Sequence, residues 1–340
     1  MIRLKDIAAQ ADVSVMTVSK ALRDAPDISV ATKARIKLLS QRMGYVPDSA
    51  ARGLRSRTTK LLGLLLPSVT NPIFARVVTA IEERAHELGY ELILSHTLNQ
   101  PEREEVCIRR LLSRRVDGLF IHPVYRLAPT AAVYQELIVR RAPVVILGHR
   151  APFCAPFVNV ETDDLFGSYM LTNHLIEIGH RKIAFFTGPL AAPWAQERIE
   201  GYRRALREAG IEWDDRLIFT AGSNIEDGKK AALQMLNESV QATAIQAVND
   251  LVAIGALQVL LPQHLRVPED ISVAGFGNIM ASEYCQVPLT TIRQAKLRWG
   301  ATAMEVMQKL LRGETPESKR LPSEIVLRAS TAPPKPAPAS

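Results

Sequence analysis

The sequence lacks the features that mark secreted, membrane-spanning and zinc-binding proteins. Its three cysteines, Cys107, Cys154 and Cys285, form no CxxC pair, so neither a disulfide framework nor a zinc motif is predicted. No apolar run reaches the roughly 18 residues that a membrane helix needs. The N-terminal segment also lacks the apolar core of a secretory leader. We therefore expect a cytoplasmic protein with no membrane partner, no metal and no cofactor.

Motifs for catalysis are missing as well. The chain has no GxSxG, P-loop or GxGxxG sequence, and its histidines and cysteines do not have metal-ligand spacing. The adjacent carboxylates Asp163 and Asp164 are more typical of a helix start than of an acid–base pair. An enzyme on an α/β scaffold is therefore the less favoured class, and we do not expect catalysis.

Glutamate is absent from the first 60 residues. These residues carry twelve Lys and Arg side chains against five Asp, which is the whole formal excess of seven positive charges. The remaining 280 residues carry thirty basic and thirty acidic side chains. A basic head on a neutral body is typical of nucleic-acid binding, although a solvated basic arm or a membrane-surface patch would have the same composition.

Residues 1–47 have the pattern of three short helices that form a helix-turn-helix unit. Ser14 is suited to cap the second helix, over 15–22, because its hydroxyl can accept a hydrogen bond from an otherwise unpaired backbone N–H. Ser29 has the same role for a third helix, which we expect to end before Gly44. The second helix of such a unit lies in the major groove of DNA, with its N-terminal residues at the base edges.

From residue 60 onward, apolar runs of strand length alternate with amphipathic helices, which predicts parallel sheets built from βαβ units. Two such series predict two doubly wound lobes behind the all-α head, with lobe 1 at about 60–160 and 292–320 and lobe 2 at about 161–291 and 321–330. Ligands of such folds bind beyond the carboxyl ends of the strands, so we expect a ligand cleft between the lobes. The strand candidates are 61–66, 91–95, 118–121 and 144–147, then 182–187, 217–220, 244–248 and 272–276.

Several dense runs of residues occur together in the head and the body. In the head these are LKDIAxxAxVSxxTVSxxL from Leu4 and GYVPDSAARGL from Gly44. In the body they include PSVTNPIF at 67–74, VNDLVAIGAL at 248–257 and RVPEDISVAGF at 266–276. Taken together, these runs resemble the LacI/GalR family of bacterial transcription regulators, and the resemblance extends to about Arg328.

The resemblance implies a periplasmic-binding-protein-like body and a homodimer that binds a palindromic operator on nucleoid DNA. It also implies a repressor under allosteric control by a small-molecule effector, for which we expect a sugar, with a sugar acid as the alternative. A cytosolic sugar-binding module without a DNA function is a competing class, and the basic head argues against it.

The resemblance assigns DNA contacts to the second helix of the head. It places Val15, Met16 and Lys20 at base-reading positions. The two apolar side chains can contact a thymine methyl group, whereas Lys20 can reach guanine acceptors or a phosphate. Alternatively, Val15 is only a helix-forming residue. The other DNA contacts expected on and beside this helix are Thr17, Ser19 and Arg23.

Residues 48–59 resemble the hinge helix and linker of the family. So short a segment cannot hold a helix in water by itself, because helix nucleation is unfavourable. The resemblance implies that the segment folds on DNA beside the hinge of a second subunit. Leu54 would then be an apolar wedge in the minor groove, with Arg52 and Arg55 on phosphates. Without DNA, a flexible basic linker is the alternative.

The resemblance also assigns effector contacts in the body. Arg198 matches an effector-clamping arginine, whose planar guanidinium suits carboxylates, phosphates or paired hydroxyls. Some of these residues also have a structural alternative. Arg198 can form a surface ion pair, Asn71 and Asp250 can cap helices, and His122 can be a structural histidine with its hydrogen bonds satisfied. The contacts expected at strand ends are Asn71, Ile73, Phe74, His122, Asn249 and Asp250.

Four positions of this expected effector site depart from the family pattern. Gly277 stands where the family usually has Asp, which removes an acceptor for sugar hydroxyls and a charge that would repel an anion. Asp163 belongs to a Thr-Asp pair in place of the usual Asp-Asn, and Ser223 replaces an aromatic residue that often stacks on sugars. Trp194 can supply the missing stacking face.

The last segment, 331–340, is rich in Pro and Ala, which predicts a disordered tail. It has no apolar heptads of the kind that form a tetramerising coiled coil. We therefore expect a dimer.

Overall fold

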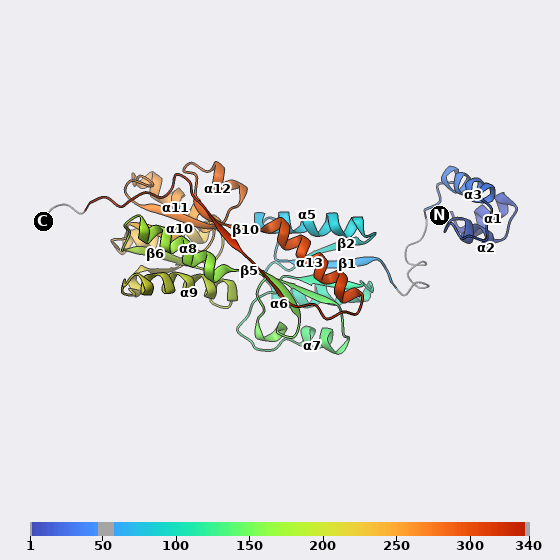
Figure 1. Cartoon of the computed structure of the whole chain (residues 1–340), viewed down its shortest axis with the longest axis horizontal. Helices are drawn as coiled ribbons and strands as arrows, with labels where there is room; N and C mark the ends of the chain where they lie inside the picture. The colour runs from blue at the N-terminus through green and yellow to red at the C-terminus, as the bar shows by residue number, and fades with distance from the viewer. Residues whose placement is uncertain (1, 47–57, 337–340) are drawn as a thin grey trace. The chain divides into compact units, whose positions relative to one another are not determined.

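The computed structural model describes residues 2–46 and 58–336, which divide into a head and a body at Thr59 and Lys60 (Figure 1). The hinge residues predicted to contact DNA, Arg52, Leu54 and Arg55, lie outside the described residues. Within the described residues no helix is long and apolar enough to cross a membrane.

The head is the predicted bundle of three helices. Ser14 accepts a hydrogen bond from the Thr17 backbone N–H (3.0 Å), and Ser29 accepts one from the Thr32 N–H (3.2 Å), so both predicted caps are confirmed. Gly44 ends the third helix at φ +68°, a conformation that glycine adopts without strain. The helices are α1 (Leu4–Ala11), α2 (Val15–Ala21) and α3 (Val30–Arg42), and their shared core is Ile7, Ala8, Ala11, Val18, Ala21 and Ile36.

Lobe 1 of the body is a fully parallel sheet covered by helices on both faces (Figure 1). Alternation along its first strand sends Leu62 and Leu64 toward α5 (Pro72–Glu87) and α13 (Lys296–Leu311). Leu65 faces α6 (Pro101–Ser113) and α7 (Ala132–Val139) on the other side. In sheet order the strands are β11 (Lys319–Leu321), β5 (Val158–Thr162), β4 (Val144–Leu147), β3 (Gly118–Ile121), β1 (Leu61–Leu66) and β2 (Glu91–His96).

Lobe 2 repeats this architecture, with one antiparallel edge strand, β12. Helices α10 (Ile225–Asn237) and α11 (Asp250–Leu260) cover one face, and α8 (Asp164–Glu177) and α9 (Pro193–Glu208) cover the other. A short helix, α12 (Met280–Tyr284), follows β9. In sheet order the strands are β12 (Ser323–Val326), β10 (Thr290–Gln294), β9 (Ser272–Gly277), β8 (Ala244–Ala247), β6 (Ile183–Thr187) and β7 (Ile218–Thr220).

The chain passes between the lobes at residues 162–164, 294–296 and 321–323. These crossings lie up to three residues beyond the predicted lobe boundaries, because β5, β10 and β11 each continue their own sheet to its edge. The first two crossings each place a strand end next to a helix start between the lobes, and the third joins β11 directly to β12.

The predicted disordered tail begins too early at residue 331. Thr331 Oγ1 lies 2.8 Å from Thr290 Oγ1, and the Ala332 N–H donates to Ser272 Oγ at 3.1 Å. The Ala332 carbonyl in turn accepts a hydrogen bond from the imidazole of His180 (3.0 Å). These backbone contacts with lobe 2 hold the start of the tail, and residues 337–340 lie outside the described part of the chain.

Candidate functional site

The head exposes apolar side chains at the start of α2. Val15 is 46% exposed and Met16 is 62% exposed, whereas Val18, one turn later, is fully buried in the core. The Ser14 cap sets this orientation, because it fixes where the helix begins and therefore which residues face inward. Thr17 and Ser19, also predicted to contact DNA, are half-buried. The predicted reading face of α2 is thus open to a partner.

Basic side chains next to this face are held by partners within the head. Lys20 Nζ lies 2.5 Å from Asp27 Oδ2, and Arg23 Nε donates to the carbonyl of Ser19 at 2.9 Å. Lys37 Nζ similarly lies 2.6 Å from Asp24 Oδ1. The side chains of Lys20 and Asp27 remain 40% and 53% exposed, so the pair is accessible to a ligand as large as DNA.

A cavity of about 280 Å³ lies between the two lobes of the body. It sits beyond the carboxyl ends of the strands, where parallel α/β sheets bind ligands. Its wall includes residues from both lobes and from two of the crossings, at Thr162 and Gln294. Among the predicted effector contacts, the lining residues are Asn71, Ile73, Phe74, His122, Trp194, Arg198, Ser223, Asn249 and Asp250.

Arg198 is a buried cation of the cavity wall, with only 6% of its surface exposed. Its Nη2 and Nε donate to Asp164 Oδ1 at 2.9 and 3.3 Å, and its Nη1 donates to the carbonyl of Val248 at 2.6 Å. The guanidinium also lies 3.7 Å from the centre of the Phe276 ring. Within the described chain these bonds use three of its five N–H donors, so two remain for a ligand.

Trp194 lines the cavity, and one face of its ring is covered by Arg198. Its ring lies against the guanidinium of Arg198, 4.8 Å from ring centre to Cζ. Stacking of this kind holds the planar guanidinium in place through cation–π attraction. Trp194 therefore supports Arg198 at the cavity wall, and whether its ring also stacks on a ligand stays a prediction.

His122 is a neutral acceptor at the cavity wall. Burial lowers its pKa to about 4, so the imidazole is uncharged at neutral pH. Nδ1 lies 2.7 Å from the carbonyl oxygen of Leu147, which can only accept, so Nδ1 carries the proton and Nε2 is left as an acceptor. The Phe74 ring packs edge-on at 4.8 Å and fixes the orientation of the imidazole.

Two predicted contacts also cap helices: Asn71, as the alternative had suggested, and Asn249, whereas the cap suggested for Asp250 is not formed. Asn71 Oδ1 accepts from the Ile73 N–H (3.2 Å), and Asn249 Oδ1 accepts from the Val252 N–H (2.8 Å). Asp250 opens α11 but turns its carboxylate to Thr291 Oγ1 (2.5 Å) and to the Ile279 N–H (2.8 Å). Burial raises the pKa of Asp250 above its ordinary value, although these two hydrogen bonds oppose the rise. The caps position Asn71 and Asn249 at the wall, and the bonds to Thr291 and Ile279 position Asp250.

Asp163 and Gly277 are not among the lining residues, contrary to the prediction for both. The Asp163 carboxylate caps α8, where it accepts from the Phe166 N–H at 3.1 Å, and the next residue, Asp164, faces the cavity instead. At Gly277 φ is +131°, and an added Cβ would lie 3.0 Å from Ile73 Cδ1. The close approach to Ile73 and the positive φ both favour glycine behind the wall.

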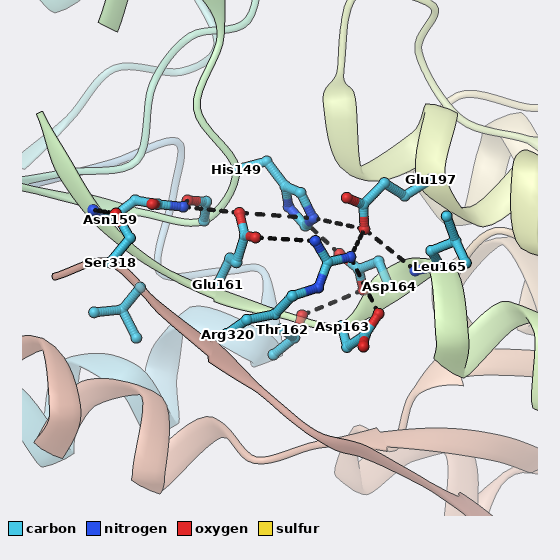
Figure 2. Close-up of polar contacts among 12 residues, drawn as sticks. His149, Asn159, Glu161, Thr162, Asp163, Asp164, Leu165, Glu197, Ser318 and Arg320 are labelled. Carbon is cyan, nitrogen blue, oxygen red and sulfur yellow. Dashed lines mark hydrogen bonds and ion pairs between the residues drawn. The ribbon is translucent and has the colours of Figure 1, made fainter. Parts of the chain in front are cut away.

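A cluster of charged side chains joins the two lobes beside the cavity, which we name the interlobe ion cluster (Figure 2). His149 Nε2 lies 3.0 Å from Glu197 Oε2, and its Nδ1 lies 3.6 Å from Asp164 Oδ2. Arg320 Nη2 lies 2.5 Å from the same oxygen of Glu197. The cluster comprises His149, Glu161 and Arg320 of lobe 1 with Asp163, Asp164 and Glu197 of lobe 2.

Electrostatics in the interlobe ion cluster favours a charged His149. Burial by itself would lower its pKa, but the carboxylates of Glu197, Asp164 and Glu161 outweigh burial and raise it. Glu197 shows the complementary shift: burial would raise its pKa, yet His149 and Arg320 lower it. Both shifts stabilise an ion pair that spans the lobes.

Sequence reasoning missed the residues that act across the lobes. His149, Asp164 and Gln294 line the cavity, but none belongs to a motif with a chemical signature. Gln294 donates from Nε2 to Thr162 Oγ1 (2.8 Å), and its buried Oε1 has no hydrogen-bond partner in the described chain. Gln294 could have been found only by its place at the end of a strand, and that strand, β10, was not predicted.

Comparison with known proteins supports the same division of the chain. Residues 3–48 match the family model of bacterial regulatory proteins of the lacI family, and residues 172–331 match a periplasmic binding protein-like domain. The HTH-type transcriptional regulator DegA of Bacillus subtilis (strain 168) is 31% identical over 330 residues, covering 96% of this chain and 97% of DegA.

Two solved structures resemble the chain over nearly its whole length. A Lac repressor dimer bound to operator and the anti-inducer ONPF has a TM-score of 0.87 at 28% identity and covers 97% of this chain and 99% of its own. A complex of the transcriptional regulator CelR with cellobiose has a TM-score of 0.74 at 28% identity and covers 97% of this chain and 100% of its own.

A helix-turn-helix head with an open reading face, joined to a two-lobed body around a cavity, defines a ligand-binding transcriptional regulator. This chain belongs to the LacI family of bacterial regulatory proteins.

Proposed function

We propose that the protein is a transcriptional repressor that binds a palindromic operator as a homodimer, and that a neutral sugar in the interlobe cavity controls its affinity for DNA. The observation that carries this proposal is the composition of the cavity wall, which draws on both lobes and on two crossings between them. A ligand that contacts both lobes binds one lobe arrangement more tightly than another. Such differential affinity is what couples an effector to a distant DNA site.

The polar groups of the cavity suit a ligand with several hydroxyls. Gln294 Oε1 and His122 Nε2 are acceptors, whereas Arg198 offers two N–H donors. Leaving a buried acceptor unpaired costs about 1–3 kcal/mol, so a ligand O–H group that reaches Gln294 gains affinity. The structural likeness to a regulator in complex with cellobiose supports the same ligand class.

The charge balance of the wall favours a neutral sugar over a sugar acid. Asp164 already pairs with Arg198, and the side chains of the two are 2% and 7% exposed. A ligand carboxylate would have to displace Asp164 or share the guanidinium with it, at the cost of repulsion between like charges. The glycine at position 277 is the observation that favours a sugar acid, since it keeps one further carboxylate away from the wall.

Tryptophan fluorescence separates these two ligand classes. Trp194 and Trp299 both line the cavity, so a ligand that enters it should change their emission. We expect saturable changes with one of a panel of neutral mono- and disaccharides, and none with the matching aldonic or uronic acids. Arg198→Lys, which retains the charge next to Asp164 but loses the fork, should weaken the response. A response to acids alone would contradict the neutral-sugar assignment.

The DNA half of the proposal is tested by selecting duplexes from a random pool with the full-length protein. We expect enrichment of a two-fold symmetric sequence, because two identical heads read two half-sites. Affinity for the selected duplex should fall steeply with salt, as phosphate contacts require. Enrichment of no sequence would contradict operator binding, and enrichment of a single half-site would contradict the dimer.

A further inference from the structure

The ion pair between Lys20 and Asp27 is exposed and involves α2, the predicted reading helix of the head. Lys20 is on α2, and Asp27 is in the loop between α2 and α3, so the pair ties the reading helix to the following turn. The separation of 2.5 Å makes this a direct hydrogen bond as well as an ion pair. Hydrogen bonding to Lys20 lowers the pKa of Asp27, which keeps the carboxylate charged at neutral pH.

The stability of the head does not require this pair. Both side chains are well exposed, and an exposed ion pair contributes little to folding because water screens it and two long side chains lose freedom. The core of the head is made of apolar residues on the inner faces of the helices, and it includes neither partner.

General affinity for DNA does not explain the pair either. A carboxylate next to the reading helix repels phosphates, and it neutralises a lysine that would otherwise release a counterion on binding. The first 60 residues carry all of the excess positive charge of the chain, so an acidic side chain at this place opposes the overall electrostatics of the head. The role that remains for Asp27 is discrimination between base pairs.

The chemistry of base edges supplies such a role. A lysine ammonium donates to the O6 and N7 atoms of guanine, and a carboxylate accepts from the N4 amino group of cytosine. Lys20 alone is a flexible point charge that can also settle on any phosphate. With its ammonium held by Asp27, a donor and an acceptor stand side by side, which matches the two edges of a G·C pair in the major groove.

We propose that Asp27 is a specificity-determining residue, which together with Lys20 reads one G·C base pair in each half-site and discourages contact of Lys20 with phosphates. This inference rests on the proposed operator binding. It also explains why a head whose foremost side chains, Val15 and Met16, offer only apolar contacts can still distinguish G·C from A·T.

The head contains a matched control for this inference. Asp24 and Lys37 form an ion pair of nearly the same length, 2.6 Å, with comparable exposure of 65% and 44%. Lys37 lies on α3 and not on the reading helix. Asp24→Asn therefore removes the same charge as Asp27→Asn from the same small unit, but the lysine that it releases is on α3 and not on α2.

The experiment selects duplexes from one random pool with the full-length wild type, Asp27→Asn and Asp24→Asn, and then sequences the bound fractions. The wild type and Asp24→Asn should enrich one symmetric consensus with a G·C pair at a shared position of both half-sites. For Asp27→Asn the preference at that one position should fall by about tenfold, the lower part of the range for a base-specific contact. The rest of the consensus should be unchanged.

Binding to a scrambled duplex over a salt series provides the second readout. Asp27→Asn should bind it more tightly than the wild type does, with a steeper salt dependence, because Lys20 is free to meet a phosphate. Asp27→Glu, which retains the acceptor, should largely restore the G·C preference. Thermal unfolding checks that each variant is folded.

The outcomes separate this inference from the proposed function. If Asp27→Asn enriches the wild-type consensus unchanged, or if Asp24→Asn loses the same position, the specificity role is overturned while operator binding stands. If the wild type enriches no consensus, operator binding and the specificity role are both overturned.

Discussion

The head and the body use charge in different ways. Charged pairs in the head, such as Lys20 with Asp27, are exposed and join only two side chains. In the body, Arg198 and Asp164 are almost fully buried, and Asp164 also contacts His149, Thr162 and Gln294. Exposed pairs can open for a partner at little cost, whereas buried networks fix one geometry. The head is thus suited to exchange its partners for DNA, and the body to couple the lobes.

The largest effect that would test this comparison is expected at Asp164. Asp164→Ala leaves the buried guanidinium of Arg198 without its counter-charge, which should lower the free energy of unfolding of the body by about 3–5 kcal/mol. Urea unfolding followed by tryptophan fluorescence measures this loss. Asp163→Ala, one residue earlier and half-buried, is the control. If both variants lose the same small amount of unfolding free energy, the buried pair of Arg198 and Asp164 contributes no more to stability than an exposed pair does.

A second, smaller effect is expected at Gly277. Gly277→Asp places a Cβ at φ +131° and 3.0 Å from Ile73, so the body should lose about 1–3 kcal/mol from backbone strain and crowding. Gly313 also has a positive φ, of +79°, but an added Cβ there meets nothing within 4 Å, so Gly313→Asp separates strain from crowding. An unchanged melting temperature for Gly277→Asp would contradict the tight approach to Ile73.

The third prediction concerns pH and the interlobe ion cluster. The pKa of His149 is raised on folding, so its contribution to stability is fully present below the ordinary value of 6.5 and is lost as pH rises through the folded pKa. The pKa of Glu197 is lowered, so its contribution is present above 4.5 and is lost as pH falls through its folded pKa. The ion pair should therefore be strongest at pH values above the folded pKa of Glu197 and below the folded pKa of His149.

His149→Gln checks this window. Comparing thermal unfolding of the variant and the wild type from pH 5 to 9 should show the largest difference at the acidic end, with the curves converging at high pH. His174→Gln is the matched control, because burial lowers the pKa of His174 and its effect on stability should have the opposite dependence on pH. A difference that grows with pH for His149→Gln would contradict the raised pKa.

The smallest effect is expected in the head. Lys20→Ala and Asp27→Asn remove an exposed pair that lies outside the core, so the melting temperature should stay within experimental error. Circular dichroism of the full-length protein measures this. A clear loss of stability would mean that the pair supports the fold, and the contrast between head and body would fail.

Much of the fold could be predicted because it depends on local patterns. The apolar runs at 61–66, 118–121 and 144–147 are strands with the predicted bounds, and the serine caps of the head are in place. A continuous apolar run signals a strand that is covered on both faces, which is the environment in a parallel sheet. The mixed composition of β5 and β10, with polar residues at the crossings, gave no such signal.

The candidate site was less predictable, because it depends on contacts between distant segments. Nothing near Arg198 in the sequence indicates that Asp164 is its partner, or that Phe276 lies against its guanidinium. Likewise, the sequence places a carboxylate at both 163 and 164, and only the cap of α8 decides which one faces the cavity.

The central claim is that a ligand between the lobes changes the affinity of the head for DNA. The most direct test is the affinity of the full-length protein for its selected duplex, measured by fluorescence anisotropy with and without the sugar that changes tryptophan emission. We expect the sugar to shift the Kd of the wild type by about tenfold or more, in the range of typical allosteric coupling. Arg198→Lys should bind the duplex normally and respond weakly. An unchanged Kd for the wild type at saturating sugar would contradict the account.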